Sequence, residues 1–296
     1  MANEFIIFIF KIIPKSLLSR VFGYITRIPV PQFLLNPVIR WYSGKFGVRT
    51  GEIVYPAGGF RTFNSFFTRK VKNGVHEIDT GRGAVVSPVD ARIDQFGKIE
   101  KTSMIQAKGV FFSLEDLVPS ESFKEFIDGS FMTLYLSPGD YHRIHSPVDG
   151  NVIGFFSIPG KLFTVQEFMV KGLQGLFSKN ERMISYINTE YGLVGVCKVG
   201  AMNVGRIGVV YEEDYRSNRF FRRRREYFYE EDSQMTLKRG DELARFNLGS
   251  TIVLLFQENM VKFSKIKCGD TVRVGQKIGT LSAPLKKKPK SGKKKQ

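Results

Sequence analysis

Short apolar runs separated by Gly, Pro and Asp make up the chain from Phe60 onward. The clearest of them are Phe131–Leu136, Leu193–Val199 and Ser250–Phe256. Runs of this kind, bounded by turn-forming residues, are typical of strands. Helical spacing of apolar residues is confined in this part to two short segments, Ser113–Val118 and Thr164–Leu176. We therefore expect an α+β protein with N-terminal amphipathic helices and a predominantly antiparallel, β-sandwich or barrel-like main domain.

One turn-and-strand pattern occurs twice in the sequence. Ser87–Ile93 (SPVDARI) is matched by Ser146–Val152 (SPVDGNV). In each copy, Pro and Asp can fix a bend that leads into an apolar stretch. Two similar turns suggest a pseudo-symmetric sandwich or barrel.

Composition fits one large globular core, because 42% of the 296 residues are hydrophobic. The only two cysteines, Cys197 and Cys268, both lie in β-like runs. This argues against a disulfide framework and favours a reducing, cytoplasmic setting. The formal net charge is +17, and seven of the lysines lie in the last segment, 286–296. A tail of this composition is expected to be disordered and attracted to polyanions, either nucleic acid or anionic lipid.

The first 59 residues are basic and partly amphipathic. The apolar run Phe5–Phe10 is too short to span a bilayer, which needs roughly 20 apolar residues, and it lacks the pattern of a secretory signal. Further on, apolar residues recur at helical spacing, at Leu17, Leu18, Val21, Phe22 and Ile25. A basic amphipathic helix is typical of an anionic membrane interface, so we expect lipid contact here, including Phe5 and Phe8. The alternative is a helix whose apolar stripe packs on the domain behind it.

A second basic segment mixes arginines with aromatic residues. Arg219–Arg225 contains five arginines and two phenylalanines. Arginine can pair with lipid phosphate while Phe enters the interface, which favours lipid contact by Arg219, Phe220, Phe221 and Arg222. The alternatives are a solvated loop beside the acidic run Glu230–Asp232 and a nucleic-acid-binding surface. Because the charge is peripheral and the β-like region carries no nucleic-acid motif, we expect no nucleic-acid partner.

Gly249 and Ser250 lie directly before the apolar run Ile252–Phe256. Glycine has no Cβ, so its carbonyl can be approached closely and held in a strained conformation. Attack by the Ser250 hydroxyl on the Gly249 carbonyl would convert the peptide bond into an ester. Elimination and hydrolysis would then cut the chain and leave a pyruvoyl group on the new N-terminus. The Gly-Ser-Thr sequence alone is a weak signal, because it is also common in β-hairpins.

Such self-cleavage needs a base for the serine and a group that orients the base. The chain has three histidines, and two of them, His142 and His145, lie three residues apart after a β-like run. In an extended or turning segment these two point to different sides, so we expect them to have different tasks. Asp90 in the first repeated turn is a candidate carboxylate partner, although it could simply form the turn. A zinc site is not expected, because too few His and Cys residues are available.

Longer motifs extend this pattern along nearly the whole chain. They are Phe63–Arg69 (FNSFFTR), Ser87–Asp90, Gln106–Gly109 (QAKG), Ser113–Leu114, Tyr135–Pro147 (YLSPGDYHRIHSP), Gly160–Val165 (GKLFTV), Leu176–Arg182 (LFSKNER), Val199–Gly205 (VGAMNVG) and Phe246–Thr251 (FNLGST). Together they resemble the bacterial-type, membrane-associated phosphatidylserine decarboxylases, the pyruvoyl enzymes that make phosphatidylethanolamine. The pairing of the Asp-Tyr-His-Arg-x-His block with Leu-Gly-Ser-Thr carries most of the specificity.

The resemblance implies roles for individual residues. Ser250 would be the cleavage nucleophile and later the pyruvoyl group, His145 its general base, and Asp90 the charge partner that orients the base. We hypothesise that His142 transfers a proton after decarboxylation. The implied enzyme is a carboxy-lyase that binds the substrate amine as a Schiff base to the pyruvoyl group and needs no metal.

The resemblance also implies partners and a location. Cleavage would give chains 1–249 and 250–296, which stay together and form a homodimer. The substrate places the enzyme peripherally on the cytoplasmic face of the cell membrane. We expect a membrane-association segment at 1–59, a catalytic domain at 60–285 and a disordered tail at 286–296. The competing interpretation is a non-catalytic β-sandwich of the same fold that binds membranes or polyanions.

Overall fold

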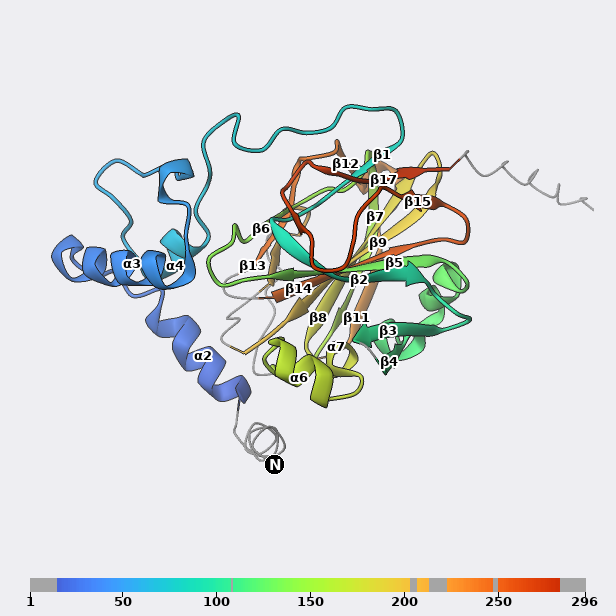
Figure 1. Ribbon diagram of the computed structural model, residues 1–296, viewed down its shortest axis with the longest axis horizontal. Coiled ribbons are helices and arrows are strands. Elements are labelled where there is room, and N and C mark those ends of the chain that lie inside the picture. The colour runs from blue at the N-terminus through green and yellow to red at the C-terminus, as the bar shows by residue number, and fades with distance from the viewer. Residues whose placement is uncertain (1–14, 108, 203–206, 213–222, 247–249, 283–296) are drawn as a thin grey trace, which may run out of the picture.

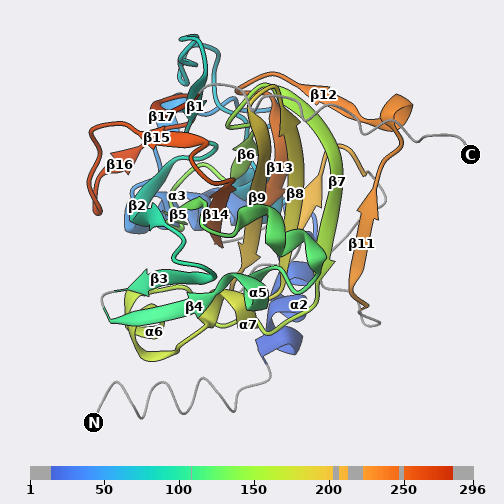
Figure 2. The ribbon, with the colours of Figure 1, turned by 90° about the vertical axis from the view of Figure 1, so that its right-hand side faces the viewer.

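A nine-stranded antiparallel sheet forms the centre of the molecule (Figures 1 and 2). The computed structural model describes residues 15–107, 109–202, 207–212, 223–246 and 250–282. The strands of the large sheet, in spatial order, are β11 (Arg225–Phe228), β7 (Gly150–Ile158), β8 (Arg182–Thr189), β9 (Gly192–Gly200), β14 (Ser250–Phe256), β5 (Ser130–Leu136), β2 (Ala91–Lys98) and β16 (Thr271–Val272), with β12 (Met235–Leu237) also on β7. The α+β, mainly antiparallel fold class expected from the sequence is confirmed.

Smaller sheets and short helices surround the large sheet. The remaining strands are β1 (Ala84–Val86), β17 (Lys277–Leu281) and β15 (Val261–Phe263) in one sheet, β10 (Ile207–Val209), β13 (Glu242–Phe246) and β6 (Arg143–His145) in a second, and the hairpin β3 (Ser103–Ala107) and β4 (Val110–Ser113). The helices are α2 (Lys15–Ile25), α3 (Gln32–Phe46), α4 (Phe63–Phe67), α5 (Leu114–Leu117), α6 (Glu167–Gly172) and α7 (Leu176–Lys179), with 3-10 turns at Thr50–Glu52, Glu121–Phe126 and Glu231–Ser233.

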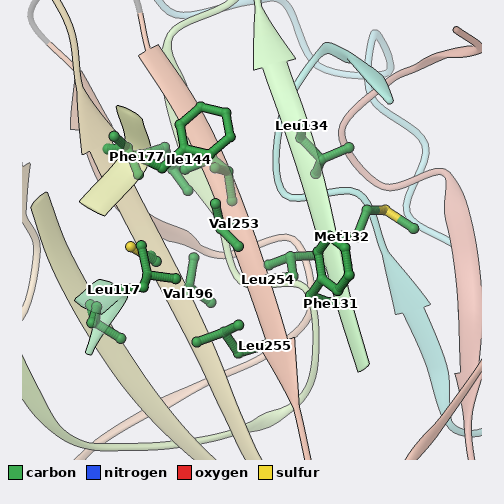
Figure 3. Close-up of a cluster of buried hydrophobic side chains, with 14 of the residues drawn as sticks. Leu117, Phe131, Met132, Leu134, Ile144, Phe177, Val196, Val253, Leu254 and Leu255 are labelled. Atoms are coloured by element: carbon green, nitrogen blue, oxygen red, sulfur yellow. The ribbon is translucent and has the colours of Figure 1, made fainter. Parts of the chain in front are cut away.

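Strand β14 lies in the middle of the core. It pairs along its whole length with β5 on one side and β9 on the other. Figure 3 shows its Val253, Leu254 and Leu255 among buried side chains of these neighbours. Because both faces of the strand are covered, the run is continuously apolar rather than alternating.

The helix expected at Thr164–Leu176 is shorter than the sequence suggested. The structure has α6 at Glu167–Gly172 and a separate α7 from Leu176. Gly175 between them adopts φ 66°, a left-handed conformation that a continuous helix does not allow. The helix expected at Ser113–Val118 is present as α5, where the Ser113 hydroxyl accepts hydrogen bonds from the N–H groups of Glu115 and Asp116.

The two copies of the repeated turn lie against each other and exchange equivalent backbone hydrogen bonds. Val86 N–H donates to the Pro147 carbonyl (2.9 Å), and His145 N–H donates to the Pro88 carbonyl (2.8 Å), which is the equivalent bond. A glycine-containing loop closes each copy in the same way.

In the first copy Gly275 N–H donates to the Ser87 carbonyl, and in the second Gly240 N–H donates to the Ser146 carbonyl, both at 3.0 Å. The Gly275 and Gly240 backbones have φ values of 86° and 84°. Both glycines approach Ile78 so closely that an added Cβ would clash with its side chain. The two turns are therefore equivalent in their local hydrogen bonds around Ile78, and a pseudo-symmetric arrangement of the whole sandwich or barrel stays a prediction.

The N-terminal helices form a second hydrophobic cluster beside the β domain (Figure 1). One face of α3 buries Leu35, Ile39 and Tyr42. The Tyr42 hydroxyl donates to the Pro138 carbonyl (2.8 Å), which joins this cluster to the segment after β5. The buried members extend to Phe67, past the boundary expected at residue 59.

The amphipathic helix expected around Leu17–Ile25 is α2. Its apolar stripe does not pack on the described core: the residues Leu17, Leu18, Val21, Phe22 and Ile25 are all exposed. The outer face of α3 is also apolar, and Phe33 and Trp41 are 75% and 61% exposed. In the described part of the chain, no helix is long and apolar enough to cross a membrane.

Candidate functional site

Strand register brings Asp90 and Ser250 to the same end of the large sheet. Ser250 begins β14 and pairs with Leu136 of β5. On the other side of β5, Tyr135 pairs with Arg92, two residues after Asp90. Strand β5 therefore lies between the strand that begins at Ser250 and the strand that follows Asp90.

The Asp90 carboxylate is buried and held from several sides. Its Oδ1 accepts the Val274 N–H (2.9 Å) and lies 2.9 Å from Nε2 of His76, while its Oδ2 accepts from Arg49 (3.2 Å). Burial alone would raise the pKa of Asp90, but His76, the Val274 N–H and Arg273 together hold it below its usual value of 3.8. Asp90 therefore carries a negative charge at neutral pH.

His145 has both ring nitrogens engaged. Nδ1 lies 2.6 Å from the Gly240 carbonyl, so it must carry the proton and donate it. Nε2 lies 3.1 Å from the Tyr141 hydroxyl. Burial lowers the pKa of His145 below 6.5, although the Gly240 carbonyl opposes this. The neutral ring therefore presents the lone pair of Nε2, which accepts the Tyr141 hydroxyl proton.

His142 is completely buried and has one free nitrogen. Its Nδ1 donates to the Asp140 carbonyl (2.8 Å), and its ring lies 4.1 Å from the ring of Phe67. Its Nε2 has no hydrogen-bond partner among the described residues. Burial lowers the pKa of His142 to about 3, so the ring is neutral at physiological pH. A buried lone pair of this kind costs stability unless a ligand or reacting group uses it.

The backbone of His142 connects it to the predicted cleavage region. Its carbonyl accepts the N–H of Phe246, the last residue of β13 and four residues before Ser250. His145 lies at the other end of this pairing, opposite Glu242. His142 therefore lies just before β6 beside the end of β13, whereas His145 ends β6 opposite the start of β13.

The structure groups the predicted residues differently from the expected charge relay. Asp90 contacts His76. The Nδ1 atom of His145 donates to the Gly240 carbonyl and not to Asp90, which we expected to orient this ring. Among the described residues no contact joins Asp90 to His145 directly. The catalytic roles themselves stay predictions.

Several predicted residues lie outside the described part of the chain. Gly249 of the cleavage site is one of them. The others are the expected lipid contacts Phe5, Phe8, Arg219, Phe220, Phe221 and Arg222, and the lysine-rich tail 286–296. For Ser250, only its backbone position at the start of β14 is described.

Sequence reasoning missed His76 and Tyr141. The His76 ring lies 5.0 Å from the Tyr141 ring and 6.5 Å from the His145 ring, and Tyr141 stacks on His145. Tyr141 was visible inside the Asp140–Pro147 block, but no motif marks His76. The rarity of histidine was the one available signal, since all three histidines lie in this region.

Metal ligation is not apparent in the residues that the structure describes: no group of three His, Cys, Asp or Glu side chains could hold an ion. The two cysteines are free, with Cys197 buried and Cys268 exposed.

Comparison with known proteins places this arrangement in a decarboxylase family. The family model for phosphatidylserine decarboxylase matches residues 63–280, which include Asp90, all three histidines and Ser250. The phosphatidylserine decarboxylase proenzyme of Myxococcus xanthus (strain DK1622) is 38% identical over 274 residues, covering 92% of this chain and 96% of the relative.

Two further relatives carry the same name. The proenzyme of Vibrio campbellii (strain ATCC BAA-1116) is 38% identical over 259 residues, covering 86% of this chain and 90% of the relative. That of Marinobacter nauticus (strain ATCC 700491 / DSM 11845 / VT8) is 36% identical over 278 residues, covering 91% and 95%. The chain belongs to the phosphatidylserine decarboxylase family.

Proposed function

We propose that this chain is a precursor that cuts its own Gly249–Ser250 bond and then decarboxylates phosphatidylserine to phosphatidylethanolamine. Family membership over most of the chain supports the reaction, since the relatives are named proenzymes. The observation that carries the cleavage proposal is the register that brings Asp90 and Ser250 to one end of the sheet.

In the cleavage step, the Ser250 oxygen attacks the Gly249 carbonyl carbon, and the peptide nitrogen takes up a proton as the ester forms. His145 is the proposed base, because its Nε2 carries the lone pair while Nδ1–H is committed to Gly240. For this, Nε2 must exchange the Tyr141 hydroxyl for that of Ser250. Loss of the Ser250 α-proton then breaks the bond between the Ser250 Cβ and the ester oxygen, which releases the Gly249 carboxylate and leaves a dehydroalanine. Water hydrolyses the dehydroalanine, so that its nitrogen leaves as ammonia and the pyruvoyl carbonyl remains.

For decarboxylation, the pyruvoyl group formed from Ser250 would supply a carbonyl that takes up the electrons left by departing CO₂. His142 is the proposed proton carrier at this stage. Its Nε2 is buried, neutral and without a described partner, so it can take a proton and return it to the substrate carbon in a site shielded from water. The unused lone pair is the feature of the described residues that fits such a group.

We further propose that the protein docks peripherally on the cytoplasmic face of the cell membrane. The exposed apolar residues of α2 and α3 support this, since a soluble surface rarely leaves so many large apolar side chains uncovered in adjacent helices. The basic character of the first 59 residues favours an anionic leaflet. We also propose that the two cleaved chains stay associated and that two such pairs form a homodimer.

Intact mass measurement of the purified wild-type protein and its Ser250→Ala variant tests the cleavage. We expect the wild type as chains 1–249 and 250–296, with a pyruvoyl-blocked shorter chain, and the variant uncut. Release of CO₂ from carboxyl-labelled phosphatidylserine in vesicles then tests the reaction. A folded, membrane-bound wild type that stays uncut would contradict the proposal and favour the non-catalytic alternative.

A further inference from the structure

His76 comes from a part of the chain with no assigned role. It lies in the segment between α4 and β1, with 8% of its side chain exposed. Its Nε2 lies 2.9 Å from Oδ1 of Asp90 but has no aligned hydrogen-bond partner among the described residues. This contact places the His76 ring against the carboxylate that the proposed self-cleavage uses.

The duplicated turn forms in its second copy without a histidine contact. Asp149 is the equivalent of Asp90 in the second copy. Its Oδ1 accepts the Arg239 N–H at 2.9 Å, as Asp90 accepts the Val274 N–H at the same distance. Asp149 is 58% exposed and its described charge partner is the Arg239 side chain, whereas Asp90 is buried against a histidine. The turn forms in both copies, so His76 is an addition to it.

The other side of His76 faces the proposed base. Its ring lies 5.0 Å from Tyr141, whose hydroxyl donates to Nε2 of His145. Burial raises the pKa of Tyr141, so this hydroxyl keeps its proton at neutral pH. His76 therefore stands between the Asp90 carboxylate and the Tyr141–His145 pair, where direct contact between Asp90 and His145 was expected.

We propose that His76 is a positioning residue for self-cleavage, which holds the Asp90 carboxylate and orients His145 through Tyr141. The inference rests on the proposed function and deepens it. The His76 nitrogen lies against the Asp90 carboxylate at 2.9 Å, and the imidazole ring fills the space against Tyr141. The charged groups around the ring are Asp90 itself and, on the far side of the carboxylate, Arg49 and Arg273.

Three variants separate charge from packing. His76→Ala removes the ring and its contact with Asp90, His76→Gln supplies a neutral polar side chain, and His76→Arg supplies a permanent cation. Glu77→Ala is the matched control, since Glu77 is exposed and adjacent in the same segment. Each chain is made by cell-free translation, and the fraction cut between residues 249 and 250 is followed by intact mass across pH. Ser250→Ala supplies the melting temperature of a folded, uncut chain.

We expect His76→Ala and His76→Gln to slow cleavage about 10-fold or more, since misplacing a reacting group by about 1 Å can cost 100-fold. His76→Arg should recover most of the rate, and Glu77→Ala should match the wild type. The inference is overturned if the Ala variant cuts at the wild-type rate. If it cuts slowly, the melting temperature of the uncut chain, compared with that of Ser250→Ala, shows whether the variant is folded. If the Ala variant does not fold, equal rates for Gln and Arg overturn it. A wild type that does not cut would overturn the proposed function as well, whereas normal cutting in all variants would overturn this inference alone.

Discussion

Asp90 and Asp149 occupy equivalent positions in two copies of one turn, and only Asp90 contacts a histidine. Each carboxylate accepts a backbone N–H at 2.9 Å, which indicates a structural task that both copies share. The histidine contact of Asp90 indicates a further task in one copy. The surroundings of the two aspartates therefore agree with the role that the resemblance implies for Asp90 alone.

We therefore expect Asp90→Asn to slow self-cleavage about 100-fold or more, because it removes the charge that faces His76 while keeping the side chain's size. Asp149→Asn is the matched control and should cut at the wild-type rate. Intact mass at fixed times after translation measures both. Equal slowing in the two variants would mean that the turn geometry, and not the charge on Asp90, supports cleavage.

His142→Ala should leave self-cleavage intact but lower turnover. The expected loss in kcat is about 100-fold, the usual contribution of a positioned proton carrier. Cleavage is read by intact mass and turnover by CO₂ release from labelled phosphatidylserine. If the His142→Ala chain does not cut itself, but shows normal turnover when cut chains are supplied by other means, our assignment of the two histidines would be reversed.

Lys198 provides a test of stability that is independent of catalysis. It is buried on β9, where it donates to the Ser185 hydroxyl and to the Val196 carbonyl (3.1 Å). Burial lowers its pKa from 10.5 to about 7. Below pH 7 the folded and unfolded chains both carry the proton, and the cost of burying the charge is fully present. Between pH 7 and 10.5 the folded chain has released the proton and the unfolded chain has not, so this cost declines as pH rises.

Lys198→Met should therefore stabilise the protein by about 1–4 kcal/mol below pH 7, and the gain should shrink toward pH 10.5. Urea unfolding of the uncut Ser250→Ala background, measured across pH, gives the free energy of unfolding. Lys262→Met on β15 is the control, since Lys262 is exposed. A gain that does not depend on pH would show that packing, and not the charge, is responsible.

The outer face of α3 should contribute to membrane binding. Replacing Phe33 and Trp41 together by Ser should weaken binding to anionic vesicles about 10-fold or more, since each side chain loses roughly 1.5–3 kcal/mol of apolar burial. Vesicle sedimentation measures the affinity, and Met235→Ser on β12 is the control for a partly exposed apolar residue elsewhere. Unchanged binding in the double variant would place the docking surface on another part of the molecule.

The strands that carry the site were predictable, because β5, β9 and β14 are apolar runs with turn residues at both ends. The roles of Asp90, His142, His145 and Ser250 could be proposed because their motifs are local in sequence. The contact of His76 with Asp90 was not, because the segment around His76 lacks periodicity and its path is set by tertiary packing around Ile78. The break between α6 and α7 could not be predicted either, because it depends on the left-handed conformation of Gly175, which composition does not determine.

Because β14 lies between β5 and β9, the uncut precursor and the proposed cut protein should differ in their ability to refold. The uncut chain can regain its structure as one molecule. After a cut at Gly249–Ser250, the segment from residue 250 onward is a central strand supplied by a separate polypeptide, held in place by hydrogen bonds along both edges and by its buried side chains. A denatured cut protein would have to recapture that strand from solution while β5 and β9 expose unpaired edges that also attract other chains. Cleavage would thus leave the folded protein intact but hinder its refolding. The stability of the mature protein would therefore be kinetic and set by its rate of unfolding.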